Sequence, residues 1–475
     1  MTLSTTTAPA SDGGRSPSVA AFLSFLWPGL GQLYAGNRRL FALFLIPSLI
    51  VIALVAYAMR QGPIVFGARF ADPAFDVAAL VVVVLFGVWR LASVVQAFTA
   101  GRQRSDRRVV DRAVLAALAV VIVVSHGFVG TVLATTYGAT SNVFSAGNDL
   151  MAGDLDTPLP SATPEQSLAT STPAPSATAT PSGRVTMLFT GVDSASTRST
   201  RSYDSLMVVS YDPRDNTVQM VSIPREIASF PFYWGGRDKA SDWITYMPNY
   251  IRSGHIKGAP DSNYIALVKE IQFLVGVHID YWAVMNLQGF VQMVAAVGGI
   301  DINAQAVTDP VYDWLDKKHF GVYIKAGQQH LNGAYALAYA RSRHSSGGSD
   351  YKRAARQQQV MLALLKKMSQ PGMIFQLNNL IARVGSNVEV GSTDAANPFK
   401  PSMVADYIAD AEAVPANNFT NLVLGPPYTA SIPHSLAGGK ASICLNIPMV
   451  ATQSIKMFGT DSLYYGKAKP ANTCP

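Results

Sequence analysis

Charged residues are scarce in this chain. Asp, Glu, Lys and Arg together make up 14% of its 475 residues, whereas hydrophobic residues make up 49%. Because soluble domains usually contain about 25% charged residues, this composition excludes an ordinary soluble protein. The excess of apolar residues must lie in long segments whose positions the hydropathy pattern reveals.

Cysteine is rarer still, with Cys444 and Cys474 as the only two in the sequence. No cluster of cysteine or histidine accompanies them, which argues against a structural zinc site at this end of the chain. If the segment lies in an oxidising compartment, the two residues either form a disulfide that ties down the tail or remain free thiols. The sequence leaves both alternatives open.

Three long apolar segments explain the composition. Residues 40–59 are uncharged throughout, and residues 75–99 and 113–137 are two further runs long enough to cross a bilayer as helices. Residues 19–36 are shorter and contain a proline and three glycines, so a re-entrant or short interfacial segment is expected there. Together, residues 19–137 are predicted to form a multi-pass membrane module.

Arginines set the predicted orientation of this module. The loop at residues 101–112 contains five arginines, which places it in the cytoplasm by the positive-inside rule. Residues 1–18 show no cleavable signal and are expected to be a disordered cytoplasmic tail. Three crossings leave the chain after residue 137 outside, so the sequence predicts a protein of the cytoplasmic membrane whose C-terminal domain is extracytoplasmic.

Residues 138–183 differ in composition from the segments on either side. Most of this stretch is rich in proline, serine, threonine and alanine and nearly lacks large apolar side chains. Such a stretch cannot bury a hydrophobic core, so an extended linker is expected. Residues 184–475 remain, which is enough for one large extracytoplasmic domain with a C-terminal extension.

The extracytoplasmic part alternates between strand-like and helical patterns. This alternation predicts the α/β fold class, with a mixed central sheet flanked by helices, in addition to the N-terminal transmembrane helices. The expected strands are residues 184–193, 206–211, 218–223, 281–285 and 300–303, and the expected helices are residues 263–275 and 287–297.

A run of basic and amide residues lies in the second half of the chain. If a helix begins at Asp350, Arg353 and Gln357 follow at i+3 and i+7 and share one face with it. Guanidinium groups bind phosphate oxygens through two parallel hydrogen bonds and stay charged at any working pH. This face, with Arg341 and Arg343 beside it, therefore predicts a phosphate or pyrophosphate site. A solvated basic helix face is the alternative.

Two carboxylates, Asp193 and Asp204, stand at the ends of the first two strand-like runs. Carboxylates that face a set of phosphate-binding arginines are suited to hold Mg²⁺ against a pyrophosphate. For either residue alone, a role in a turn or a cap is the alternative. Arg225 follows a strand and a rigid proline, which predicts a further basic group at the same rim.

Several short motifs occur in an order that resembles the LytR–CpsA–Psr family of bacterial cell-wall ligases. The resemblance is strong from about residue 185 to the 370s and weak to about residue 459, and it rests on many motifs in one order rather than on any single one. They are GVD at 191–193, DS at 204–205, VSIPR at 221–225, NLQGF at 286–290, VGGI at 297–300, QHLNG at 329–333, YARSR at 339–343 and DYKRAARQQQ at 350–359.

The resemblance implies a phosphotransferase at the outer face of the cytoplasmic membrane. Such an enzyme takes a glycopolymer from a polyprenyl pyrophosphate carrier and joins it to peptidoglycan through a phosphodiester, with Mg²⁺ on the phosphates. A pyrophosphatase side activity is a further expectation. The implied partners are the lipid-linked glycan, peptidoglycan and membrane lipid.

The resemblance also implies roles for individual residues. Asp193 and Asp204 would hold the metal, and Asp350 would orient the arginines and act as the base, together with Arg341 and Arg343 as catalytic groups. Three positions depart from the family pattern: Arg201 lies one residue farther from Asp204 than usual and is not assigned, Glu226 replaces the usual aspartate, and Lys352 replaces a common glycine. The implied pyrophosphate ligands are Arg225, Arg341, Arg343, Arg353, Gln357 and Lys239.

Two alternatives come from other functional classes. A non-catalytic receptor for polyprenyl-phosphate lipids, or an envelope-linked regulator, would need the same arginines but neither Asp193 nor Asp204. The net charge of +7 suits an anionic partner such as lipid headgroups, phosphorylated glycans or wall polymers. The basic helix suggests a nucleic-acid-binding regulator as the second alternative. The predicted extracytoplasmic placement argues against that class, and no nucleic acid is expected as a partner.

Overall fold

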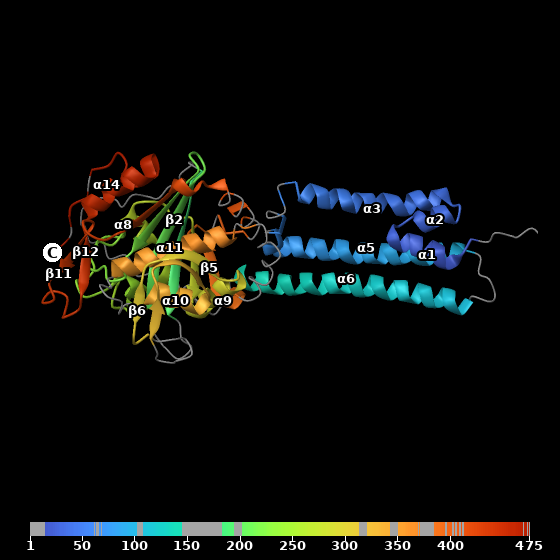
Figure 1. The fold of residues 1–475 in the computed structure, drawn as a ribbon. Helices are drawn as coiled ribbons and strands as arrows, with labels where there is room; N and C mark the ends of the chain where they lie inside the picture. Colours follow the sequence, from blue (N-terminus) through green and yellow to red (C-terminus); the bar gives the residue numbers. More distant parts are fainter. Residues whose placement is uncertain are drawn as a thin grey trace, which may run out of the picture. The chain divides into compact units, whose positions relative to one another are not determined.

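The structure is a computed structural model and consists of two compact units, formed by residues 1–66 with 72–137 and by residues 67–71 with 138–475. Figure 1 shows its helices and strands. It describes residues 15–475 except 61, 63–65, 68, 102–107, 145–182, 194–201, 313–320, 343–349, 369, 371–383, 395–396, 401–402, 404–405, 408–409, 411–412, 469, 473 and 475.

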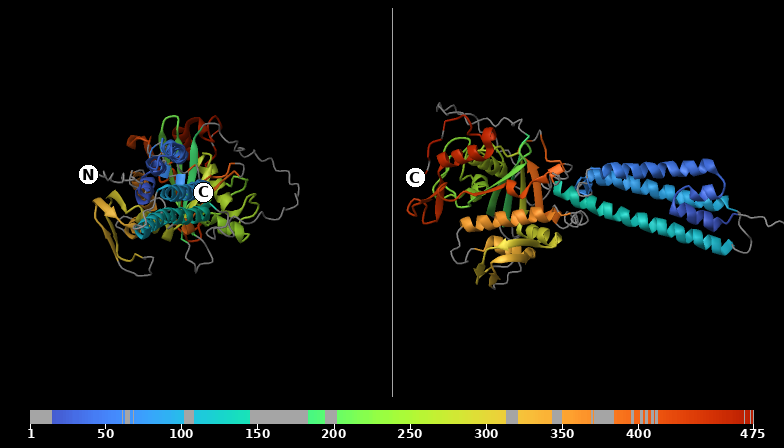
Figure 2. Two further views of the ribbon diagram at one scale, coloured as in Figure 1. Left: turned by 90° about the vertical axis from the view of Figure 1, so that its right-hand side faces the viewer. Right: turned by 45° about the horizontal axis from the view of Figure 1, so that its top comes forward.

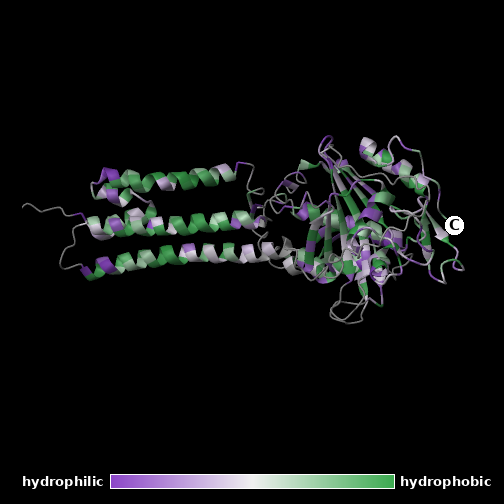
Figure 3. Cartoon of the chain, turned by 180° about the vertical axis from the view of Figure 1, so that it is seen from behind, coloured by the Kyte–Doolittle hydropathy of each residue, from purple (hydrophilic) through white to green (hydrophobic). Residues whose placement is uncertain are grey.

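The first unit is helical and strongly apolar. Three of its helices are long and apolar enough to cross a membrane, over residues 38–58, 73–100 and 108–138, and Figure 3 shows hydrophobic colouring along most of their length. The three predicted spans are therefore confirmed as apolar helices, and their orientation stays a prediction. The helices are α1 (Pro17–Leu26), α2 (Leu30–Tyr34), α3 (Arg38–Ala58), α5 (Pro73–Ala100) and α6 (Arg108–Phe144), and the 3₁₀ turn η1 (Arg69–Ala71) between α3 and α5 is counted with the second unit.

The segment before the first long helix forms two short helices. Neither α1 nor α2 is long enough to span, and the chain breaks between them at Gly29, whose φ of 105° favours glycine. Gln32 on α2 is buried, accepts a hydrogen bond from the Ser24 hydroxyl (2.8 Å) and donates one to the Ser93 carbonyl of α5 (2.8 Å). Polar contacts inside an apolar unit thus hold the short helices α1 and α2 against the long helix α5.

The second unit is built on a six-stranded sheet with the order β10-β3-β2-β1-β4-β9. Pairs β1/β2, β2/β3 and β4/β9 are antiparallel, and pairs β1/β4 and β3/β10 are parallel. The predicted mixed sheet is therefore confirmed. Its strands are β1 (Val185–Asp193), β2 (Ser202–Asp212), β3 (Thr217–Ile223), β4 (Tyr281–Asn286), β9 (Val388–Ser392) and β10 (Phe419–Val423).

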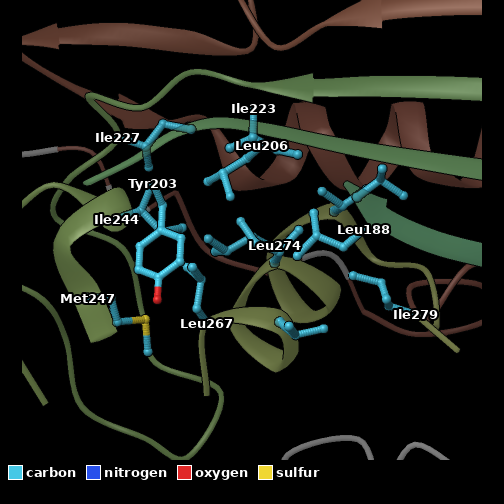
Figure 4. Packing of buried hydrophobic residues seen from close by; sticks show 14 of the residues in the cluster. Leu188, Tyr203, Leu206, Ile223, Ile227, Ile244, Met247, Leu267, Leu274 and Ile279 are labelled. Carbon is cyan, nitrogen blue, oxygen red and sulfur yellow. The ribbon is translucent and has the colours of Figure 1, made fainter. Parts of the chain in front are cut away.

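Helices cover both faces of this sheet (Figure 2). Alternate residues of β2 face opposite layers: Leu206 and Val208 pack into the main core, which includes helix α8 (Asn263–Val275). Met207 and Val209 pack towards helix α11 (Asp350–Met368). Figure 4 shows the first of these layers, where Leu188, Leu206 and Ile223 from the sheet meet Leu267 and Leu274 of α8.

Short strands and further helices surround the sheet. The predicted strand at residues 300–303 exists, but it pairs with β8 and does not join the central sheet. These elements are β5 (Ile300–Ala304), β6 (Val307–Asp309), β7 (Val322–Ile324), β8 (Gly327–Leu331), β11 (Thr429–Ile432), β12 (Ser442–Leu445), α7 (Met247–Arg252), α9 (Leu287–Ala296), α10 (Gly333–Arg341), α14 (Ile447–Phe458), η2 (Ile244–Tyr246), η4 (Gly385–Asn387), η5 (Ala416–Asn418) and η6 (Gly459–Asp461).

The motifs NLQGF at 286–290 and QHLNG at 329–333 each contain the residue at the start of a helix, its N-cap. Asn286 and Asn332 are the N-caps of α9 and α10, and their side chains accept hydrogen bonds from the backbone N–H groups of Gly289 (2.7 Å) and Tyr335 (3.0 Å). A Cβ atom on Gly333 would lie 2.2 Å from the Val291 carbonyl oxygen. Glycine at this position therefore allows α10 to approach α9 closely, which sets the direction in which α10 runs.

The C-terminal cysteines pair. Cys444 on β12 forms a disulfide with Cys474, which resolves the alternatives left by the sequence. The tail that follows α14 is also held by charge, because Arg184 Nε lies 2.8 Å from Asp461 Oδ2. The C-terminal extension is thus an integral part of this unit.

Two buried carboxyl groups, Glu270 and Asp238, have raised pKa values. Glu270 of α8 is fully buried and accepts a hydrogen bond from the Tyr233 N–H (3.1 Å). Burial, and then the charge of Asp238, hold the pKa of Glu270 well above its usual value. Burial and the charge of Asp242 raise the pKa of Asp238 to about 8. Burial therefore favours the protonated form of both carboxyl groups in the folded protein.

Glu270→Gln is expected to flatten the pH dependence of stability. Because the folded pKa exceeds the unfolded value of about 4.3, the folded protein binds more protons and the free energy of unfolding falls as the pH rises above that value. Removing one titrating group should reduce this slope by about 1.4 kcal/mol per pH unit. Unfolding measured at pH 5 and pH 8 tests this, with the exposed Asp215→Asn as the control; equal slopes in wild type and Glu270→Gln would contradict it.

Candidate functional site

The two predicted metal-binding carboxylates lie at one edge of the central sheet. Strand β1 ends at Asp193, and the antiparallel β2 begins at Ser202, which pairs with Asp193 in the ladder. Asp204 follows two residues later and accepts a hydrogen bond from the Ser202 hydroxyl (2.8 Å). The end of one strand and the start of its neighbour therefore bring the two carboxylates to the same edge.

A bulge in β2 determines how Asp204 is presented. Gly191 pairs with Ser205 and Val192 pairs with Tyr203, so Asp204 has no partner residue on β1. In a regular strand, side chains three residues apart point to opposite faces. The extra residue Asp204 shifts this alternation by one, so Tyr203 and Leu206 both pack into the same core. Asp204 is thereby left at the rim, where it reaches Arg225.

Arg225 connects three carboxylates. It follows β3 and Pro224, and its Nη1 lies 3.5 Å from Asp204 Oδ1. Its Nε lies 3.7 Å from Asp350 Oδ2, and its Nη2 lies 3.4 Å from Glu226 Oε1. Arg225 therefore links the sheet edge to the first residue of α11.

The predicted face of α11 is confirmed as a shared face. The helix begins at Asp350, whose Oδ1 lies 2.8 Å from Arg353 Nη1. One turn further, the side-chain amide oxygen of Gln357 (Oε1) accepts a hydrogen bond from the Ser205 hydroxyl on β2 (3.2 Å). The spacing i, i+3 and i+7 thus places all three side chains against the sheet edge.

Arg341 is the last residue of α10 and faces the end of β1. Its Nη2 lies 4.0 Å from Asp193 Oδ2. Arg343 lies outside the described residues, so its assignment stays a prediction. We use the name arginine–carboxylate cluster for the described charged side chains at this edge: Asp193, Asp204, Arg225, Glu226, Arg341, Asp350 and Arg353.

Lys239 is placed differently from these residues. Its side chain is exposed and makes no hydrogen bond or ion pair with the arginine–carboxylate cluster among the described residues, while its backbone carbonyl accepts from the N–H groups of Ser229 and Asp242. No contact in the structure tests its predicted role at the phosphates. That role stays a prediction.

Arg356 lies on another face of α11 than Asp350 and Gln357 and, like Arg353, is buried. Its Nε donates to the Tyr339 carbonyl (2.7 Å), and its Nη2 donates to the Ser342 carbonyl. These are the last carbonyls of α10, so Arg356 ties α11 to the helix end that carries Arg341. The residue is a structural link and not part of a solvated basic surface.

Glu226 is a member of the cluster that sequence reasoning did not assign. Burial and the hydrogen bond and charge of Asp350 raise the pKa of Glu226 to about 7, against a smaller lowering effect of Arg225. The two carboxyl groups therefore share a proton near neutral pH. The only signal in the sequence was that Glu226 stands where the resembled family usually has aspartate.

The cluster fits a metal ion that is shared with phosphate oxygens. Mg²⁺ is usually held by one or two carboxylates together with water and substrate phosphates, and Asp193 and Asp204 supply such a pair at one edge. Among the described residues, no group of three or more His, Cys, Asp or Glu is placed to hold a metal ion. A role for Mg²⁺ at Asp193 and Asp204 stays a prediction, in which water and substrate phosphates would supply the remaining ligands.

Comparisons with known proteins show which proteins this chain is similar to. The chain is 31% identical over 204 residues to the polyisoprenyl-teichoic acid–peptidoglycan teichoic acid transferase TagV of Bacillus subtilis (strain 168), which covers 43% of this chain and 48% of that protein. It is 30% identical over 209 residues to the transferase TagU of Bacillus mycoides (strain KBAB4), covering 44% and 60%. The chain thus spans about half the length of the curated relatives it matches.

A solved structure and a family model extend the comparison. The crystal structure of Bacillus subtilis TagV is similar with a TM-score of 0.44 and 23% identity, over 58% of this chain and 97% of that chain. The model of the LytR_cpsA_psr family matches residues 156–407. Since this match covers more than half of the sequence, the chain belongs to the LytR_cpsA_psr family.

Proposed function

We propose that this protein transfers a glycopolymer from a polyprenyl pyrophosphate carrier to peptidoglycan through a phosphodiester, with Mg²⁺, at the outer face of the cytoplasmic membrane. The observation that carries the proposal is the arginine–carboxylate cluster, in which side chains from β1, β2, the segment after β3, α10 and α11 converge at one sheet edge. The relatives TagV and TagU, whose names describe teichoic acid transfer to peptidoglycan, support the substrate class.

The charges of the cluster suit phosphoryl transfer. Such a reaction needs positively charged groups next to the negatively charged phosphate oxygens, and an aligned nucleophile, more than covalent help from the protein. In the cluster, Arg225, Arg341 and Arg353 each lie within 4.0 Å of a carboxylate. Bound Mg²⁺ would supply charge neutralisation next to Asp193 and Asp204. The arginines would then exchange carboxylate oxygens for pyrophosphate oxygens.

The proposed reaction has a defined balance. The acceptor hydroxyl oxygen forms a bond to the phosphorus that carries the glycan, the bridging P–O bond of the pyrophosphate breaks, and polyprenyl phosphate leaves. The hydroxyl proton passes to the carboxyl pair of Asp350 and Glu226. Because the pKa of Glu226 is raised to about 7, this pair can exchange a proton near neutral pH, where general-base help is worth about 10²–10⁴-fold.

The proposed location outside the cytoplasm has independent support in the disulfide. Structural disulfides persist in oxidising compartments and are rare in the cytosol, and the second unit contains the pair Cys444–Cys474. The apolar helices α3, α5 and α6 suit a membrane anchor. This placement would bring the cluster to the side of the membrane where peptidoglycan lies.

A transfer assay tests the proposal. The full-length protein in detergent is mixed with a polyprenyl pyrophosphate-linked glycan, peptidoglycan and Mg²⁺, and both wall-linked glycan phosphate and released polyprenyl phosphate are measured. We expect the two products in equal amounts, and release without acceptor would reveal the expected pyrophosphatase side activity. Tight binding of the donor without either product would contradict transfer and favour the lipid-receptor alternative.

A further inference from the structure

The end of the chain contains a hairpin that lies beyond the residues matched by the family model, which are 156–407. Strands β11 and β12 pair antiparallel from Thr429 with Leu445 to Ile432 with Ser442. Cys444 of β12 is bonded to Cys474. We call residues 429–445 the C-terminal hairpin.

The C-terminal hairpin is joined to the backbone that directly follows Arg225. The Ala228 N–H donates to the Ile443 carbonyl (2.8 Å), and the Ile443 N–H donates to the Glu226 carbonyl (3.1 Å). Ile227 and Ile443 form a parallel bridge. Two backbone hydrogen bonds therefore hold the segment that carries two members of the arginine–carboxylate cluster.

Trp243 connects the hairpin to the Arg225 guanidinium. The Cζ atom of Arg225 lies 5.2 Å from the centre of the Trp243 ring, a distance at which a cation is attracted to an aromatic face. The indole Nε1–H donates to the Ser442 hydroxyl of β12 (3.1 Å). The ring also packs on the small core that contains Ala228 and Cys444. One edge of the indole is thus fixed by the hairpin while its face supports the arginine.

The hairpin contacts the second charged element of the site as well. The hydroxyl of Tyr351, which follows Asp350 on α11, lies 3.0 Å from the Thr429 hydroxyl. The C-terminal hairpin therefore touches both the segment that carries Arg225 and the first turn of α11. These are the two elements that the ion pair between Arg225 and Asp350 joins.

We infer that Trp243 is a positioning residue for Arg225 and that the disulfide-closed C-terminal hairpin holds Trp243 in place. The inference rests on the proposed function, in which Arg225 binds the pyrophosphate. A guanidinium that lies against a fixed aromatic face is restricted to fewer orientations before the anion arrives, so less side-chain freedom is lost on binding. The hairpin thereby adds a support to the anion site from outside the family-matched region.

The test uses the binding of inorganic pyrophosphate with Mg²⁺ to the full-length protein in detergent. Trp243→Leu removes both the aromatic face and the indole N–H, and we expect affinity to fall by about two- to thirtyfold. Trp243→Phe keeps a face for the guanidinium but removes the indole N–H, so it should lose measurable affinity, less than Trp243→Leu loses. Ser442→Ala removes only the acceptor of the indole N–H and should behave like Trp243→Phe.

A matched control separates positioning from general destabilisation. Trp282 is a core indole of β4 that donates to the Ser392 carbonyl (3.3 Å). Trp282→Phe should lower the thermal midpoint without weakening pyrophosphate binding. Wild-type affinity in Trp243→Leu, or an equal affinity loss in Trp282→Phe, would overturn the inference. If Trp243→Leu fails to fold, the affinities of the other variants are compared. Trp243→Phe and Ser442→Ala should each bind pyrophosphate more weakly than Trp282→Phe, and equal affinities would overturn the inference.

The disulfide provides a second arm of the same experiment. Cys474→Ser opens the disulfide and leaves Trp243 and Ser442 unchanged, so we expect a loss of affinity of the size seen in Ser442→Ala. A Cys474→Ser protein that binds pyrophosphate like the wild type would overturn the role of the hairpin. Failure of the wild-type protein to bind pyrophosphate is a different result, because it would remove the proposed anion site itself.

Discussion

Replacing Asp193 or Asp204 by asparagine is expected to abolish Mg²⁺-dependent transfer. Both carboxylates lie at one sheet edge, and each is paired with an arginine of the cluster. Asparagine keeps the size of the side chain but removes the charge that a hard cation requires. Loss of a metal that neutralises developing phosphate charge should lower the rate by about 10³-fold or more.

The measurement is the transfer rate as a function of Mg²⁺ concentration in the two variants. Ser202→Ala is the matched control, since it removes a hydrogen bond to Asp204 and leaves both carboxylates in place. It should retain most of the rate at the same Mg²⁺ concentration. Asparagine variants with a wild-type rate and Mg²⁺ dependence would show that Asp193 and Asp204 do not hold the metal.

The second large effect is expected when arginine is replaced by lysine at Arg341 and Arg353. Lysine keeps the charge but cannot bind two oxygens in one plane, so a true phosphate-binding fork should lose about 1–3 kcal/mol per site. This corresponds to roughly ten- to a hundredfold in the transfer rate. Arg343→Lys is expected to behave in the same way from its place in the sequence.

The choice of control for these variants follows from the structure. Lys352 is exposed on the same helix as Arg353, so Lys352→Gln changes the charge of α11 outside the cluster. Arg356 is unsuitable, because its buried guanidinium donates to the Tyr339 and Ser342 carbonyls. Similar small losses in the lysine variants and in Lys352→Gln would indicate a merely basic surface.

Predictions based on local periodicity agree with the structure. The strand at residues 184–193 and the helix at 263–275 appear as β1 and α8 with nearly the same bounds. Asp350, Arg353 and Gln357 share a face of α11, as their spacing indicates. In each case the pattern lies within one continuous segment, where the period of the backbone decides which side chains share a face.

Predictions that depended on neighbours from elsewhere in the chain were less complete. The sheet contains β9 and β10, neither of which was expected, and the expected strand at residues 300–303 pairs outside it. Arg356 reads as one more basic residue of α11 but is buried against the end of α10. Burial of a charged side chain depends on what packs over it, and no local pattern records that.

By itself, the sequence determined the apolar helices, the α/β pattern and the shared face of Asp350, Arg353 and Gln357, because each follows from composition or spacing along one segment. Only the tertiary structure decided that Arg225 lies between Asp204 and Asp350, that Asp350 helps to raise the pKa of Glu226, and that the Trp243 ring lies next to the Arg225 guanidinium. These contacts join segments far apart in the chain. Their geometry depends on strand order, on a bulge at Asp204 and on the C-terminal hairpin, and each of these is a pairing between segments that no local pattern records.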